Sequence, residues 1–168
     1  MPEVPELTAD QRETLLRRAW YGHDGRWFAA VAAEFGLDAA NRVNRKALRA
    51  ATVGEMRGVA KTIGVEKAAD LDEFLAAFDA AAIVFVPRSL MEFEVKRVDN
   101  RSYEISFQRC FVHENITKAG IADHYVCAVF DRVAGWHDAL GLPLAEEPAA
   151  LPCAKAQGEE CRRTMTIQ

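Results

Sequence analysis

The chain has 168 residues; half are apolar and 27% are charged, which is typical of a folded globular protein and argues against a disordered one. The net charge of −4 argues against nucleic acid as a partner, because phosphate binding requires a basic face. The longest apolar run, residues 80–87, is far shorter than the roughly 20 residues that cross a bilayer, so we expect no membrane partner either.

Residues 1–7 contain two prolines and two glutamates and predict a loose N-terminal arm. They do not have the apolar centre of a signal peptide, so we expect a cytoplasmic location. Cysteines in that compartment stay reduced. The four in this chain are therefore interpreted as free thiols or metal ligands rather than as disulfides: Cys110, Cys127, Cys153 and Cys161.

Residues 8–86 show the apolar spacing of amphipathic helices. Capping boxes that begin at Thr8 and at Asp70 predict the start of the first and the last of these helices. The glycines between them are expected to divide the stretch into four or five short helices: Gly22, Gly36, Gly54 and Gly64. Such short helices are stable only when they pack on one another or on a sheet.

The densest basic stretch is NRVNRKALR, residues 41–49. Its charges would lie on one side of a helix. This pattern favours a solvated helix face, and an anion-binding or partner-binding site is the alternative.

The spacing changes from residue 91 onward. Residues 91–98 alternate apolar and polar side chains, a turn signal follows at Asp99, and residues 102–110 alternate again, which predicts a β-hairpin with one buried face. Cys110 is in phase with the polar residues and is expected on the face opposite the apolar one. Residues 161–168 predict a third antiparallel strand that would carry Cys161 toward Cys110.

Two further helices are expected between the hairpin and the last strand, one at residues 113–119 and one from Asp123 to the stop at Gly141. Cys127 would lie in the first turns of the second helix. His124 precedes Cys127 by three residues and Asp131 follows it by four, so all three would lie on one side of that helix.

The sequence therefore predicts an α+β fold. Its N-terminal helical half packs on a small antiparallel β-sheet, made of the hairpin and the C-terminal strand, beside a central cysteine-bearing helix. We expect one domain of residues 1–168, with a helical half at residues 8–86 and the cysteines in residues 87–168.

The first functional hypothesis is a metal site. Thiolates bind zinc or an iron–sulfur cluster, and an imidazole completes Cys₃His sites, so the candidate ligands are Cys110, Cys127, Cys161 and His113. Their spacing is not the paired CxxC pattern of a zinc ribbon. Cys153 is interpreted as a loop thiol with no role.

The second hypothesis is a metal-free thiol hydrolase. Cys127 near a helix N-terminus would be the nucleophile, because helix N-termini lower the pKa of thiols. His113 or His124 would be the general base, and Asp131 would orient it. The sequence does not decide whether the protein is an enzyme; if it is one, this hypothesis makes it a hydrolase.

The third hypothesis is a non-catalytic module that binds a small molecule or a partner in an apolar groove between helices and sheet. Across the three hypotheses we expect a small-molecule ligand, with no nucleic acid and no membrane as partner. A homodimer is compatible with the sequence.

Two segments resemble known families. WYGHDGRWFAAVAAEFGLDAANRVN resembles the opening of an uncharacterised prokaryotic family of unknown function, with a W-Y-x-x-D-x-R-W-F…E-F-G…A-N-x-x-N pattern over residues 18–167. RCFVHENITKAGIADHYVCAVFD and KAQGEECRRTMTI are similar to the aminothiazoline-carboxylate hydrolase-like family. The second resemblance implies roles for the cysteines at positions 110, 127 and 161, backbone roles for Gly120 and Gly158, and ring-opening hydrolysis of a small cyclic cysteine precursor as the family's reaction.

Overall fold

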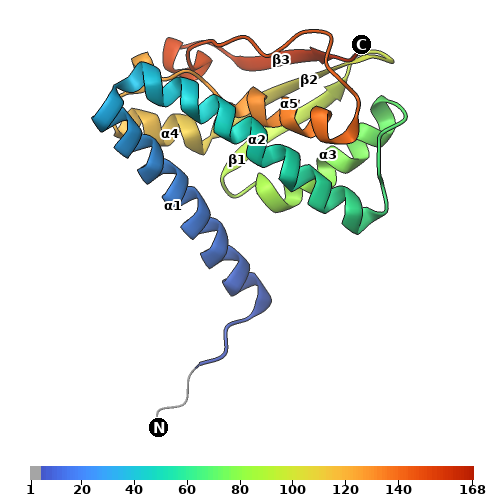
Figure 1. Ribbon diagram of the computed structural model, residues 1–168, viewed down its shortest axis with the longest axis horizontal. Coiled ribbons are helices and arrows are strands. Elements are labelled where there is room, and N and C mark those ends of the chain that lie inside the picture. Colours follow the sequence, from blue (N-terminus) through green and yellow to red (C-terminus); the bar gives the residue numbers. More distant parts are fainter. Residues whose placement is uncertain (1–4) are drawn as a thin grey trace. The chain divides into compact units, whose positions relative to one another are not determined.

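The computed structural model describes residues 5–168 and divides the chain into two compact units (Figure 1). The first unit ends at Ala40, and the second runs from Asn41 to Gln168. Of the predicted N-terminal arm, residues 1–4 lie outside the described residues. The predicted arrangement as one domain stays a prediction.

Helix α1 (Ala9–Phe35) belongs to the first unit and is longer than predicted. The capping box is confirmed, since the Thr8 side chain accepts from the Gln11 N–H at 3.2 Å and the Gln11 side chain accepts from the Thr8 N–H at 2.9 Å. The predicted end at Gly22 is wrong. An interior glycine costs a helix only about 1 kcal/mol and keeps both backbone hydrogen-bonding groups, so α1 continues to its C-cap at Gly36.

Two more helices complete the helical half. α2 (Leu37–Ile63) also continues through a glycine, Gly54, where a break was predicted. α3 (Leu71–Phe85) begins at the predicted cap, where the Asp70 side chain accepts from the Asp72 and Glu73 N–H groups at 3.0 Å each. Among the described residues, no helix is both long and apolar enough to cross a membrane.

The sheet is antiparallel with the strand order β1-β2-β3 (Figure 1). β1 (Met91–Arg97) and β2 (Ser102–Cys110) form the predicted hairpin, and β3 (Cys161–Thr166) pairs with β2 as the predicted third strand. The α+β fold class and the helical N-terminal half are thus confirmed.

Four short helical elements connect β2 to β3. They are α4 (Phe111–Lys118), the 3₁₀ turn η1 (Ala122–His124), α5 (Val129–Leu140) and the 3₁₀ turn η2 (Ala154–Gln157). The helix predicted from Asp123 is wrong at its start. Only one 3₁₀ turn forms there, and α5 begins six residues later, at Val129.

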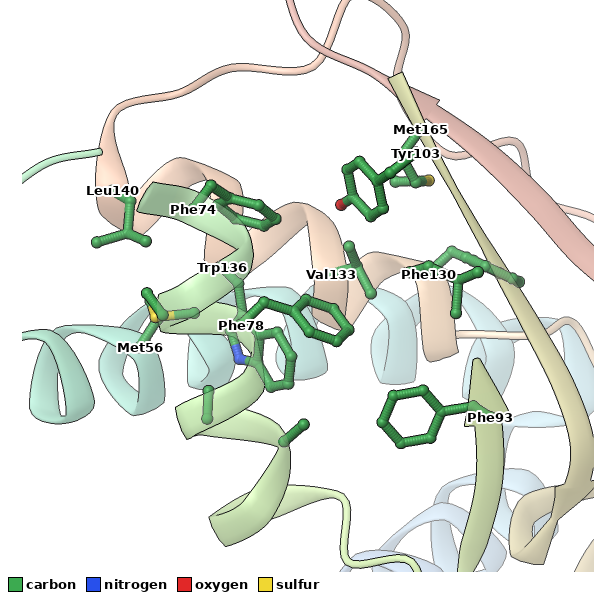
Figure 2. Packing of buried hydrophobic residues seen from close by; sticks show 14 of the residues in the cluster. Met56, Phe74, Phe78, Phe93, Tyr103, Phe130, Val133, Trp136, Leu140 and Met165 are labelled. Carbon is green, nitrogen blue, oxygen red and sulfur yellow. The ribbon is translucent and has the colours of Figure 1, made fainter. Parts of the chain in front are cut away.

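The core of the second unit contains side chains from α2, α3, α5 and all three strands (Figure 2). Its centre is aromatic. Phe78 meets the Trp136 ring edge-on at 5.1 Å between centroids, and Phe107 meets Phe130 in the same way at 6.0 Å. The edge-to-face geometry adds to the free energy of burial.

His137 is a fully buried polar group in this core. Its Nδ1–H donates to the Leu142 carbonyl at 2.8 Å, so its Nε2 accepts from the Tyr103 hydroxyl at 2.6 Å. The ring also stacks on Phe74 at 3.7 Å between centroids. Both nitrogens are thus satisfied in the neutral form, and burial lowers the pKa of His137 to about 4.

We expect this histidine to make the protein sensitive to acid. Below the ordinary pKa of 6.5 the unfolded chain binds a proton that the folded chain excludes, so stability falls from pH 6.5 to about pH 4, by roughly 3 kcal/mol from this group. Urea unfolding at pH 7.5 and pH 4.5 measures the loss. The variant His137→Gln does not titrate and should show a smaller loss over this interval. An equal loss in both proteins would contradict the assignment.

Candidate thiol site

Cys110 is the last residue of β2 and the N-cap of α4. The predicted exposure of Cys110 on the polar face is wrong, because the β1–β2 register shifts between Glu92 and Phe93. Phe93 pairs with Phe107 and Glu92 pairs with Arg109, so Gln108 is an extra, bulged residue. The bulge reverses the alternation, and Cys110 is buried in the hydrophobic core.

The bulge also links β2 to η2. The Lys155 ammonium donates to the Gln108 carbonyl at 2.8 Å. Lys155 lies two residues after Cys153, so this bond fixes the segment of Cys153 beside the end of β2 that carries Cys110. η2 also contacts α4 and η1.

Cys127 lies just before α5, outside any helix. Val126 forms an isolated antiparallel bridge with Pro152, and the Cys127 N–H donates to the Leu151 carbonyl at 3.0 Å. The bridge places two cysteine-bearing segments side by side, since Cys153 directly follows Pro152. Cys153 is buried, which an unstructured loop thiol would not be.

Cys161 begins β3 opposite Phe107 of β2, three residues before Cys110. It is partly buried and packs against the core. The four cysteines are all free thiols, and they lie at the end of β2, before α5, at the N-cap of η2 and at the start of β3. We refer to Cys110, Cys127, Cys153 and Cys161 as the thiol set.

Burial and the other cysteines raise the pKa values of three of these thiols. Burial, followed by the charges that Cys161, Cys110 and Cys153 would carry, raises the pKa of Cys127 to about 12. The same causes, with Cys110 and Cys153 as neighbours, raise the pKa of Cys161 to about 11. The pKa of Cys110 is raised by burial first and also by Cys153. Burial is the leading cause for all three thiols, and the neighbouring cysteines act in the same direction.

Positive groups around the set act in the opposite direction. The backbone N–H groups of Val112 and His113 at the start of α4 oppose the rise in the pKa of Cys110, and that of Val129 does so for Cys127. The Lys155 ammonium favours the thiolates of both Cys110 and Cys161. The surroundings thus contain charge that would stabilise anionic sulfur.

Within residues 5–168, no three His, Cys, Asp or Glu side chains are arranged to hold a metal ion. His113 is half-buried in the first turn of α4, and only its backbone N–H acts on Cys110. His124 is exposed at the end of η1. The Asp131 carboxylate binds Arg45, with nitrogen–oxygen distances of 2.7 and 2.9 Å, so its described hydrogen bonds orient no histidine.

Part of the basic stretch of α2 forms ion pairs and hydrogen bonds with other segments of the protein. Arg45 also donates to the Pro148 carbonyl at 2.7 Å, and Arg49 binds Asp138 at 2.7 and 3.0 Å as well as Glu147. These bonds hold α5 and the segment that precedes Cys153. The prediction of a solvated face applies only to the exposed cations of this stretch, Arg42 and Lys46.

Two asparagines of the same helix hold the segment that precedes Cys127. The Asn41 side chain binds the backbone of His124 and Val126, and the Asn44 side chain hydrogen-bonds the buried Tyr125. Cys153, Asn41 and Lys155 were therefore missed as site residues. The sequence signal for this contact is a pair of asparagines three residues apart on one helix, Asn41 and Asn44. The segment that they bind lies more than 80 residues further along the chain.

The protein thus has an α+β fold with a small antiparallel sheet, and its four free cysteines lie near one end of that sheet. The chain belongs to a family of unknown function, DUF6125, whose model matches residues 9–134. The match is consistent with the predicted membership of an uncharacterised family. It includes Cys110 and Cys127 and ends before Cys153. No curated protein and no solved structure matches the chain.

Proposed function

We propose that the second unit is a metal-binding domain in which the thiol set holds one soft metal ion, such as zinc. The observation that carries this proposal is that backbone contacts bring the thiol-bearing segments together in pairs. The Val126–Pro152 bridge joins the segments of Cys127 and Cys153, and Cys161 lies opposite Phe107, three residues before Cys110. Four thiolates are a complete tetrahedral ligand set for zinc. The ligand set differs from the predicted one in a single member, because Cys153 takes the place of His113.

The ionisation of the thiols supports a cation as the missing partner. The raised pKa values mean that the thiols of Cys110, Cys127 and Cys161 are protonated at neutral pH. A metal ion displaces those protons, so binding relieves the repulsion between sulfurs and releases protons to solvent. Among the described residues no three such side chains form a coordination shell, so metal binding would require a rearrangement of the thiol set.

The same data disfavour the metal-free hydrolase. A cysteine nucleophile reacts as the thiolate, and burial raises the pKa of Cys127 to about 12. His124 is exposed and Asp131 is paired with Arg45, so neither is arranged as its base or orienting group. The hydrolase-like resemblance of the C-terminal half therefore stays a prediction without support from the geometry.

Cobalt(II) titration tests the ligand set. We expect the absorption bands of a four-thiolate cobalt site in the wild-type protein, and we expect their shape to change in Cys153→Ser, which leaves three sulfurs. The matched control is His113→Ala, which should give the wild-type spectrum. Loss of the bands in His113→Ala with retention in Cys153→Ser would restore the Cys₃His alternative.

A further inference from the structure

Helix α1 carries a row of exposed apolar side chains. Leu16, Trp20 and Trp27 follow one another at spacings of four and seven residues, which places them on one face of the helix. Their exposed fractions are 71%, 53% and 60%. Single exposed apolar residues are ordinary on a protein surface, but a row of large ones on one helix face indicates an interaction surface. We refer to these three residues as the tryptophan stripe.

The same helix contains no fully buried side chain. This holds for the whole of Ala9–Phe35, which lies within the described residues. Most of the stability of a helix in a protein comes from an apolar face that packs on a neighbour. A helix of this length with two exposed tryptophans is therefore expected to pack its stripe against a further surface, and the charges beside the stripe indicate which surface.

The charges at the two ends of the stripe are complementary to a second copy of α1 that runs antiparallel. Arg12 in the first turn and Glu34 in the last turn are both exposed, and their separation of about six helical turns places both on the face of the stripe. In an antiparallel pair, Arg12 of each chain meets Glu34 of the other, which gives one ion pair at each end. A parallel pair in register would place Arg12 beside Arg12 and Glu34 beside Glu34.

The same antiparallel alignment brings the aromatic side chains together. With Arg12 level with Glu34 of the second copy, Trp20 lies only about 1.5 Å along the helix axis from Trp27 of that copy. The contact occurs twice, because the pair has two-fold symmetry. Aromatic pairs of this kind dominate the energetics of interfaces.

One acidic residue would approach its own copy in this arrangement. Asp24 lies near the middle of α1, close to the two-fold axis. The His23 ring lies 3.6 Å from its carboxylate in each chain, and half of the Asp24 side chain is exposed to water. The repulsion between the two carboxylates is therefore screened, whereas the two ion pairs and the stripe contacts are favourable.

We propose that α1 is a dimerisation helix whose tryptophan stripe packs against the stripe of a second, antiparallel copy of this chain. The occupant of the stripe is a second copy because the charges of α1 complement those of α1 itself when one copy is reversed. The proposal concerns only the first unit and is independent of the thiol set and of any metal.

Sedimentation equilibrium of the full chain tests the dimer. We expect a wild-type dimer at micromolar concentration and a dissociation constant at least about 30-fold higher in Trp27→Ala. Leu16→Ala and Leu15→Ala form a matched pair, because both leucines are exposed and adjacent but only Leu16 lies on the face of the stripe. Leu16→Ala should raise the dissociation constant by about 10-fold, whereas Leu15→Ala should stay within about 3-fold of wild type.

Charge exchange tests the orientation and protects the test against misfolding. Arg12→Glu and Glu34→Arg each place like charges at both ends of an antiparallel pair, so each should raise the dissociation constant by about 10-fold. The double variant Arg12→Glu with Glu34→Arg restores opposite charges and should dimerise within about 3-fold of wild type. In a parallel pair, neither single variant would weaken the dimer.

Three results would overturn the proposal. The first is a wild-type chain that stays monomeric up to about 100 μM. The second is a dimer that Trp27→Ala and Leu16→Ala leave unchanged, because another surface would then hold it together. The third is a monomeric wild type that binds vesicles of anionic phospholipid and loses this binding in Trp27→Ala, which would assign the stripe to a membrane surface instead.

Discussion

Replacing Glu55 by alanine is expected to lower the free energy of unfolding by about 3–5 kcal/mol. Glu55 of α2 is 8% exposed and forms an ion pair with Arg132 of α5, which is 9% exposed. The same carboxylate oxygen accepts from the Trp136 indole N–H at 3.3 Å. Alanine would leave a buried guanidinium and a buried indole N–H without this partner, and that desolvation cost is the reason for the large effect.

Denaturant unfolding of three variants separates the cost of leaving a buried partner unpaired from the cost of losing any ion pair. Glu160→Ala removes an exposed partner of Arg162 and should cost no more than about 1 kcal/mol. The double variant Glu55→Met with Arg132→Met removes both buried charges and should be markedly more stable than Glu55→Ala. A loss in Glu55→Ala no larger than in Glu160→Ala would show that the pair is not buried in solution.

Replacing Gly135 by alanine is the second change with a large expected effect. Gly135 lies where α5 crosses α2, and a Cβ built there would stand 2.0 Å from Thr52 Oγ1 and 2.6 Å from the Arg49 carbonyl oxygen. The carbonyl belongs to the helix backbone and cannot turn aside, so the two helices must separate. We expect a loss of about 1–3 kcal/mol from overpacking, although alanine is the better helix former.

Gly54→Ala is the matched control for this prediction, because it places the same methyl group on a helix with nothing within 4 Å. Only the helix propensity then changes, and thermal unfolding should show a gain of up to about 1 kcal/mol. Opposite signs at the two glycines are the expected result. A gain at Gly135 as well would mean that α2 and α5 are not in close contact there.

The parts of the fold that depend on local sequence could be predicted. The hairpin follows from the alternation of residues 91–98 and the turn at Asp99, and the helix caps at Thr8 and Asp70 follow from side chains that bind neighbouring N–H groups. The third strand could also be predicted, because an alternating segment after a hairpin has few partners other than an edge strand of that hairpin.

The errors occur where long-range packing determines local structure. The bulge at Gln108 has no signature in the residues around it, yet it turns Cys110 from the polar face into the core. The segment that precedes α5 carries a helical apolar pattern, but its backbone is held outside a helix by Asn41 and Pro152, which are distant in sequence.

The candidate site was predictable only in part for the same reason. A strand end, a helix start and a strand start, together with the family resemblance, single out Cys110, Cys127 and Cys161. The Pro- and Ala-rich connection around Cys153 predicts a loop thiol with no role. Its burial depends on the bridge to Val126 and on the bond from Lys155 to the bulge. Neither contact has a local pattern that a single sequence displays.

Metal content, measured on tag-free protein purified without oxygen, decides whether the thiol set binds a metal. We expect about one zinc ion per wild-type chain, and loss of that metal in each of the four cysteine-to-serine variants, at positions 110, 127, 153 and 161. The brown absorbance of an iron–sulfur cluster with the same dependence would keep the thiol set as the site and change the metal. A folded wild-type protein that contains no metal and takes up none when zinc or iron is added would contradict the account.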